Sequence, residues 1–248
     1  MQLSAPVAIV TGGASGMGAA TARLLAREGY RVAIVDKGSE QGNAVADEVG
    51  GVAHIGSVAD SAFCAETVGS VLATFGRIDV LINAAGVIVR ATAANTTDEQ
   101  WREIFSVNVD GVFFMSRAVI PSMREANKGA IVNFGSIWGS VGAAGHSAYA
   151  ATKGAVHQLT KSMALEHARD GIRINAVCPG EIRTPMLASE RLRPPTEDEL
   201  AELADATVPM GRLGEPEEVA AVVAFIASDA ASYMTGSMVT VDAGFTAR

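Results

Sequence analysis

The chain has 248 residues, of which 49% are hydrophobic and 19% charged, and this composition excludes a disordered protein. Its 27 acidic and 19 basic side chains give a formal net charge of -8, which disfavours nucleic acid as a partner. The longest clean apolar run, Val219 to Ala227, is far shorter than the ~20 residues of a membrane span, so we expect no membrane insertion.

The two cysteines and the N-terminal sequence both favour a cytoplasmic protein. Cys64 and Cys178 lie far apart, without the spacing of a zinc site, so they fit a reducing compartment and predict no metal site. No basic segment precedes the first apolar stretch, and Pro6 and the following glycines interrupt that stretch. We therefore expect no signal peptide.

Short β-branched runs alternate with longer helical patterns along the chain. The candidate strands are Val7–Thr11, Arg31–Asp36, Val52–Val58, Val80–Ala84, Ala130–Gly135, Ile172–Val177 and Met238–Asp242. The helical stretches lie near Gly16–Glu28, Glu40–Val49, Asp60–Phe75, Asp98–Arg124, Tyr149–Ala168 and Glu215–Ala227. This alternation predicts a single α/β domain over residues 1–248, with a doubly wound parallel sheet of about seven strands and helices on both faces.

The segment near residues 184–209 breaks this alternation. It contains the consecutive prolines Pro194 and Pro195, an acidic cluster and no strand. An insertion here follows the carboxyl end of a strand, where ligands bind in open sheets. We predict that the segment forms a substrate lid, and a surface helix pair is the alternative.

A glycine-rich turn follows the first strand. The sequence TGGASGMG, from Thr11 to Gly18, has G-x-x-x-G-x-G spacing and precedes a helix. Such glycines let the backbone approach a pyrophosphate at the positive end of the helix, and a simple tight turn is the alternative.

Asp36 ends the second predicted strand. An acid at this place accepts hydrogen bonds from ribose hydroxyls and repels a 2′-phosphate, which favours NAD over NADP. The adjacent Lys37 offers a phosphate some counter-charge, and a capping or loop role for Asp36 is the alternative.

Four polar residues in the middle of the chain form a candidate catalytic group. Tyr149 and Lys153 are four residues apart on one predicted helix, so their side chains are neighbours, although such pairs are usually surface contacts. Ser136 ends the fifth predicted strand, at the edge where a crevice is expected. Asn108 lies among apolar residues of a helix, where it either acts in the site or satisfies core backbone.

These motifs occur in order, together with the sequences NAAG (residues 83–86) and Pro179-Gly180, and the whole chain resembles a classical short-chain dehydrogenase/reductase. The resemblance implies a Rossmann-like fold and a dinucleotide that carries the hydride. It implies that Tyr149 is the general acid/base, and that Lys153 stabilises the phenolate and binds the nicotinamide ribose. It further implies that Ser136 hydrogen-bonds the reacting oxygen and that Asn108 holds a water of a proton relay.

The glycine turn and the resemblance together imply a set of cofactor contacts. They are Gly12, Ser15, Gly16, Met17, Gly18, Asp36, Ser57, Val58, Asn83, Ala84, Ala85, Gly86, Tyr149, Lys153, Pro179, Gly180, Ile182 and Thr184. In the family, Asn83 and Gly86 correspond to residues beside the adenosine ribose. Ser57 stands where the family usually has an aspartate that contacts adenine, so a hydroxyl replaces a charge here.

The candidate substrate contacts surround the catalytic group. They are Ser136, Trp138, His146, Tyr149, Glu181 and Met186. Glu181 either faces the pocket and hydrogen-bonds a hydroxylated substrate or pairs with Arg183 in solvent, and we favour the ion pair.

The helices near Asp98–Arg124 and Tyr149–Ala168 are apolar around much of their circumference, more than one buried stripe requires. The family commonly forms dimers and tetramers through these helices, so the resemblance implies a homotetramer.

The sequence therefore predicts an NAD-dependent oxidoreductase that interconverts a small secondary alcohol or polyol and its ketone. An NADPH-dependent 3-oxoacyl thioester reductase is the first alternative, although it would want a basic residue where Ser15 stands and no acid at Asp36. A non-catalytic dinucleotide-sensing regulator is the second, and the complete catalytic group argues against it.

Overall fold

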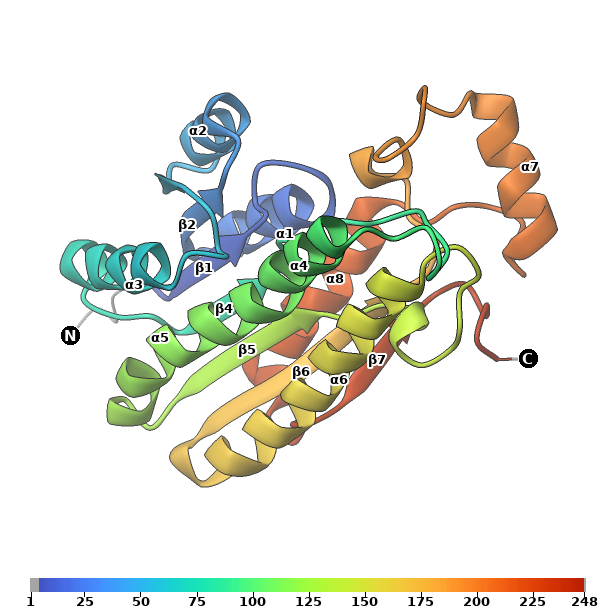
Figure 1. The fold of residues 1–248 in the computed structure, drawn as a ribbon. Helices are drawn as coiled ribbons and strands as arrows, with labels where there is room; N and C mark the ends of the chain where they lie inside the picture. The colour runs from blue at the N-terminus through green and yellow to red at the C-terminus, as the bar shows by residue number, and fades with distance from the viewer. Residues whose placement is uncertain (1–4, 248) are drawn as a thin grey trace.

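The structure is a computed structural model, and it describes residues 5–247. Seven parallel strands form one sheet in the order β3-β2-β1-β4-β5-β6-β7 (Figure 1). The strands are β1 Val7–Thr11, β2 Arg31–Asp36, β3 Val52–Ile55, β4 Val80–Asn83, β5 Gly129–Phe134, β6 Ile172–Pro179 and β7 Met238–Val241. The predicted seven-stranded parallel sheet is confirmed.

Helices cover both faces of this sheet. They are α1 Gly16–Arg27, α2 Ser39–Glu48, α3 Ser61–Phe75, α4 Asp98–Phe105, α5 Gly111–Glu125, α6 Ser147–His167, α7 Glu197–Thr207 and α8 Pro216–Ala227. One core cluster joins the sheet to α1, α2 and α8, and a second joins it to α3, α5 and α6. Every residue of β1, β4 and β5 is buried, because apolar helix faces meet each strand from both sides.

The helix predicted over Asp98–Arg124 is divided in two. A capping box between Thr97 and Gln100 starts α4, and a π-helical turn, Ser106–Asp110, separates α4 from α5. By length and composition the combined stretch Asp98–Glu125 could cross a membrane. Here α5 packs against α3 and the sheet, so it is a core helix of this fold.

The third strand also ends earlier than predicted, at Ile55 rather than Val58. A Cβ on Gly56 would lie 2.4 Å from the Phe63 ring, so the chain turns there over α3. The side chain of Asp60 then accepts hydrogen bonds from Ala62 N and Phe63 N and caps α3.

The segment near residues 184–209 contains a short 3-10 turn, η4 (Pro185–Leu187), and the single helix α7. It is therefore not the helix pair considered as the alternative. In Figure 1 α7 stands at the periphery, beyond the edge of the sheet. Leu200 and Ala204 anchor α7 by packing with Leu213.

Candidate functional site

The glycine turn between β1 and α1 is too crowded for larger side chains. Gly12 has a φ of 65°, and a Cβ there would lie 2.7 Å from the Ala85 backbone. A Cβ on Gly18 would lie 2.1 Å from the Gly12 carbonyl oxygen. The turn is therefore tight, and the N-terminal residues of α1 line a cavity in which the helix dipole favours an anion.

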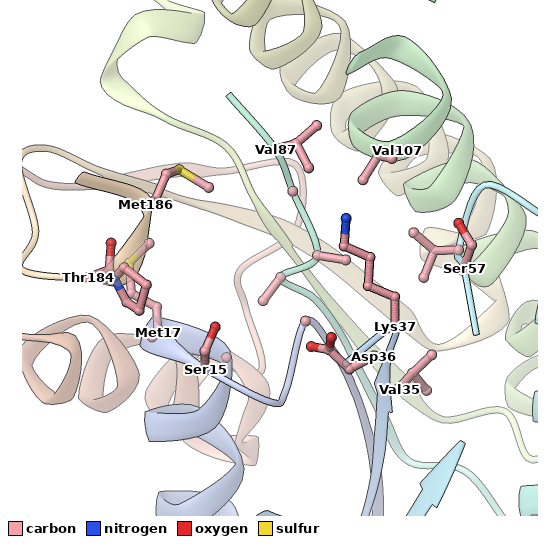
Figure 2. Close-up of a pocket in the computed structure, with 18 of the residues that line it drawn as sticks. Ser15, Met17, Val35, Asp36, Lys37, Ser57, Val87, Val107, Thr184 and Met186 are labelled. Atoms are coloured by element: carbon pink, nitrogen blue, oxygen red, sulfur yellow. The ribbon is translucent and has the colours of Figure 1, made fainter. Parts of the chain in front are cut away.

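This first cavity, of about 210 Å³, lies beyond the carboxyl ends of β1, β2 and β4 (Figure 2). It brings together most of the predicted cofactor contacts: Gly12, Ser15, Gly16, Met17, Gly18, Asp36, Ser57, Val58, Ala84, Ala85, Gly86 and Thr184. These residues come from segments far apart in the sequence. They meet because the strands of a parallel sheet all end at the same carboxyl edge of the sheet.

Asp36 and Lys37 both line the first cavity and point in different directions. Figure 2 shows the Asp36 carboxylate directed toward Ser15 and the Lys37 amine directed toward Val87. The carboxylate accepts hydrogen bonds from Ala14 N at 3.1 Å and from Gly38 N at 2.9 Å. A carboxylate offers about four acceptor positions, so these two bonds leave capacity for ribose hydroxyls.

The side chain of Asn83 does not line either cavity, contrary to the expected contact with a ribose. Its Nδ2 donates to Ser116 Oγ at 3.1 Å and to Asn133 Oδ1 at 2.9 Å. Asn133 in turn donates to Thr160 Oγ1 at 2.9 Å. Asn83 therefore belongs to a buried polar chain that joins β4 and β5 to the helices on one face.

Ser136, Tyr149 and Lys153 meet beneath a second cavity. Ser136 follows β5 and caps a 3-10 turn, with its hydroxyl accepting a hydrogen bond from Trp138 N at 3.2 Å. The Ser136 side chain lies close enough to the Tyr149 hydroxyl to oppose the rise in the pKa of that phenol. Lys153 Nζ lies 5.4 Å from the centre of the Tyr149 ring and donates to Phe134 O at 2.7 Å. Tyr149 and Lys153 are only 8% and 5% exposed, which excludes a surface pair.

Burial shifts the two titrating groups in opposite directions. It raises the pKa of Tyr149 to about 12, and the Ser136 side chain opposes this shift. Burial also lowers the pKa of Lys153 to about 8. Burial of the ring therefore favours the neutral phenol, and a phenolate there requires positive charge beside the ring.

Asn108 lies in the π-helical turn and is 1% exposed. Its Oδ1 accepts from Val87 N at 2.8 Å, and its Nδ2 donates to Val87 O at 2.9 Å and to Thr152 Oγ1 at 3.1 Å. Thr152 Oγ1 donates to Tyr149 O at 2.7 Å. Both amide N–H groups are thus used to hold the backbone after β4 against α6, and neither is free to hold a water.

The second cavity, of about 290 Å³, opens over Ser136 and Tyr149 and shares Met17, Thr184 and Met186 with the first. All six predicted substrate contacts line it: Ser136, Trp138, His146, Tyr149, Glu181 and Met186. The expected nicotinamide-side residues Pro179, Gly180, Ile182 and Thr184 form the adjoining wall. Two cavities that share a wall provide room for a cofactor and a small substrate side by side.

The favoured ion pair between Glu181 and Arg183 is absent from the described residues 5–247. Arg183 instead contacts Glu197 at 2.7 Å and Glu215 at 3.4 Å. Glu181 lines the second cavity, where burial raises the pKa of its carboxyl group while Arg90 and Arg191 oppose that shift. Glu181 therefore faces the second cavity instead of pairing with Arg183.

Arg90 also lines the second cavity, and no sequence motif predicted it as a site residue. Its guanidinium donates to Ser189 O at 3.0 Å and to Met186 O at 3.2 Å, and it lies 3.0 Å from His146 Nε2. Arg90 thus ties the segment after β4 to the segment that contains η4. The only local signal was that this arginine directly follows the apolar run at residues 87–89.

His157, a residue of α6, lies directly behind the Ser136 loop. Its Nε2 accepts a hydrogen bond from Ser136 N at 3.4 Å and lies 3.2 Å from Cys178 Sγ. Cys64 and Cys178 are both buried and free, in separate parts of the fold. Within residues 5–247, no three His, Cys, Asp or Glu side chains gather in a way that could hold a metal ion.

Comparison with known proteins finds relatives along nearly the whole chain. A protein-family model described as enoyl-(acyl carrier protein) reductase matches residues 12–246. The chain is 42% identical over 246 residues to the cyclopentanol dehydrogenase of Comamonas sp. (strain NCIMB 9872), with 97% of each chain covered. It is 39% identical over 249 residues to the 3-oxoacyl-[acyl-carrier-protein] reductase FabG of Thermotoga maritima, covering 98% of this chain and 99% of that protein. The crystal structure of levodione reductase matches with a TM-score of 0.92 at 36% identity, and 98% of each chain is covered.

Proposed function

This chain belongs to the short-chain dehydrogenase/reductase family, and we propose that it is an NAD-dependent oxidoreductase that interconverts a small secondary alcohol or polyol and its ketone. The observation that carries the proposal is the cluster of Ser136, Tyr149 and Lys153 beneath the second cavity, which adjoins the first. The relative that acts on cyclopentanol supports a compact alcohol as substrate.

The first cavity fits a dinucleotide because it combines a crowded glycine turn, a helix N-terminus and a carboxylate at the end of β2. When bound there, the nicotinamide supplies or accepts the hydride. Asp36 supports NAD because its remaining acceptor capacity suits two ribose hydroxyls and its charge repels a 2′-phosphate. The Lys37 amine points toward Val87 and away from the Asp36 carboxylate, so it offsets little of the negative charge of a 2′-phosphate (Figure 2).

The side chains of the catalytic group have different roles in the proton transfer. In ketone reduction the neutral Tyr149 phenol donates its proton to the substrate oxygen, and Ser136 hydrogen-bonds the same oxygen and orients it. In alcohol oxidation Tyr149 accepts the proton, and the buried Lys153 ammonium beside the ring stabilises the resulting phenolate. Asn108 acts as a positioning residue, since its side chain fixes the start of α6 against the segment after β4.

A replacement of Tyr149 tests this assignment. Tyr149→Phe removes the proton donor and leaves the ring, so turnover should fall by at least ~100-fold while NADH affinity stays within about twofold. The measurements are the absorbance of NADH during alcohol oxidation and its fluorescence during titration. Turnover equal to that of the unchanged protein would refute the role of Tyr149, and binding without turnover in the unchanged protein would favour a dinucleotide sensor.

The second candidate function is the reduction of a 3-oxoacyl thioester with NADPH, which the Thermotoga relative favours. Ser15 and Asp36 both disfavour it, because neither provides positive charge for a 2′-phosphate. Parallel titrations with NADH and NADPH separate the two candidates. Tighter NADH binding supports the alcohol dehydrogenase, and tighter NADPH binding supports the thioester reductase.

We also propose a cytoplasmic homotetramer in which the segment near residues 184–209 acts as a substrate lid. Trp101 on α4, Phe113 on α5 and Leu165 on α6 are 46%, 40% and 82% exposed, so a subunit interface would remove apolar surface from water. Met186 and Leu203 place both parts of the lid segment in the wall of the second cavity. Light scattering tests the tetramer, and a monomer at micromolar concentration would contradict it.

A further inference from the structure

The wall of the second cavity is mostly apolar. Ile88, Ile137, Trp138, Met186 and Leu203 present hydrocarbon or aromatic surface around Ser136 and Tyr149. The reacting oxygen of a substrate is accounted for by Ser136 and Tyr149. A substrate that carried only that oxygen would therefore need no other polar group in the wall.

Glu181 supplies such a polar group. It lies in the segment after β6 and lines the cavity, and no hydrogen bond or ion pair from another residue within 5–247 reaches its carboxylate. Its charge is close enough to Tyr149 to influence the pKa of the phenol. The carboxylate is open to the solvent in the cavity, and a substrate hydroxyl that replaces this water can donate a hydrogen bond to it.

The groups around Glu181 restrict what that ligand carries. Arg90 and Arg191 line the same cavity, so the surroundings of Glu181 already hold two positive charges and disfavour an ammonium group. Glu181 repels a carboxylate on the substrate, and Arg90 already contacts Ser189 O, Met186 O and His146, which leaves Arg191 as the cation for such a group. A neutral hydroxyl satisfies both limits, since it donates to the carboxylate and carries no charge.

We infer that Glu181 is a specificity-determining residue that accepts a hydrogen bond from a second hydroxyl of the substrate. The enzyme then acts on diols or polyols, and in reverse on hydroxyketones, in preference to alcohols with a single hydroxyl. This inference rests on the proposed function. A hydrogen bond to a charged acceptor that is otherwise unpaired corresponds to roughly 10- to 100-fold in kcat/KM between a diol and its monohydroxyl analogue.

Matched substrate pairs test this inference. Cyclopentanol is compared with cis- and trans-1,2-cyclopentanediol, and 2-butanol with 2,3-butanediol, each with NAD as oxidant. The unchanged protein should prefer the better diol of each pair by about 10-fold or more. In Glu181→Leu this preference should vanish because the diol loses activity while the monohydroxyl alcohol retains or gains it. Glu181→Gln should keep part of the preference, since its amide oxygen still accepts a hydrogen bond.

Glu66→Gln is the matched control, because Glu66 is an exposed residue of α3 that lines neither cavity. It should leave both kcat/KM values unchanged. Thermal unfolding of each variant confirms that it folds, and the substrate comparison in the unchanged protein stands without any variant.

The outcomes separate this inference from the function on which it rests. Equal activity on both members of each pair, or an equal loss on both in Glu181→Leu, overturns the role of Glu181 and leaves the alcohol dehydrogenase standing. A preference for a hydroxy acid over the diol also overturns it and indicates that Arg90 and Arg191 bind the substrate carboxylate. No turnover of any alcohol removes the proposed function and this inference together.

Discussion

The imidazole of His157 is enclosed between the Ser136 loop and β6. A Cβ added to Gly135 or to Gly139 would lie 2.4 Å or 2.5 Å from the ring, so the two glycines leave a slot that the ring fills. Nε2 accepts from Ser136 N, and Nδ1 lies 3.4 Å from Ser140 Oγ. These contacts suit a neutral ring that accepts at Nε2 and carries its proton at Nδ1.

The acid stability of the fold should therefore depend on His157. Burial, with the charges of Lys153 and Lys161, lowers the pKa of His157 from 6.5 to about 4. The unfolded chain binds a proton here below pH ~6.5 and the folded chain only below pH ~4, so stability falls as the pH falls between these values. Above that window the group contributes no pH dependence. The full shift corresponds to about 3 kcal/mol, of which about 2 kcal/mol is lost by pH 5.

Urea unfolding at pH 7 and at pH 5 measures this loss. His157→Leu and His157→Gln both remove the titrating group, so each should lose about 2 kcal/mol less than the unchanged protein between the two pH values. Both variants also lose the contact with Ser136 N and should be about 1–3 kcal/mol less stable at pH 7. The comparison uses the difference between pH values, so this constant loss cancels. Parallel pH dependence in all three proteins would refute the reasoning.

Three other substitutions test particular parts of the structure. Thr97→Ala removes the side chain that accepts from Gln100 N at the start of α4, and urea unfolding should show a loss of about 1 kcal/mol, whereas no loss would mean that this cap is not formed in solution. Gly18→Ala places a Cβ against the Gly12 carbonyl, so fluorescence titration should show NADH affinity falling at least ~10-fold, and unchanged affinity would contradict the crowded turn. Asn83→Leu leaves Ser116 and Asn133 without their donor, so the free energy of unfolding should fall by about 1–3 kcal/mol while NADH affinity in the folded protein is unchanged. A selective loss of NADH affinity in this variant would instead support the predicted contact between Asn83 and a ribose.

Local sequence patterns were enough to predict the layered fold and the principal catalytic candidates. Alternating strand and helix patterns predicted the parallel sheet, because strands buried on both faces and amphipathic helices leave periodic signals within a few residues. The glycine turn, Asp36 and the spacing of Tyr149 and Lys153 are likewise local patterns, and the structure places them around two adjoining cavities.

The contacts of Asn83, Glu181 and His157 could be seen only once the elements were packed together. The partners of Asn83 lie 33 and 50 residues away in the sequence, and His157 meets Ser136 across 21 residues. Arg183 could have paired with Glu181 but meets Glu197 and Glu215, because the starts of α7 and α8 bring those acids to it. Such contacts depend on how whole elements pack together, and no spacing within a single element encodes them.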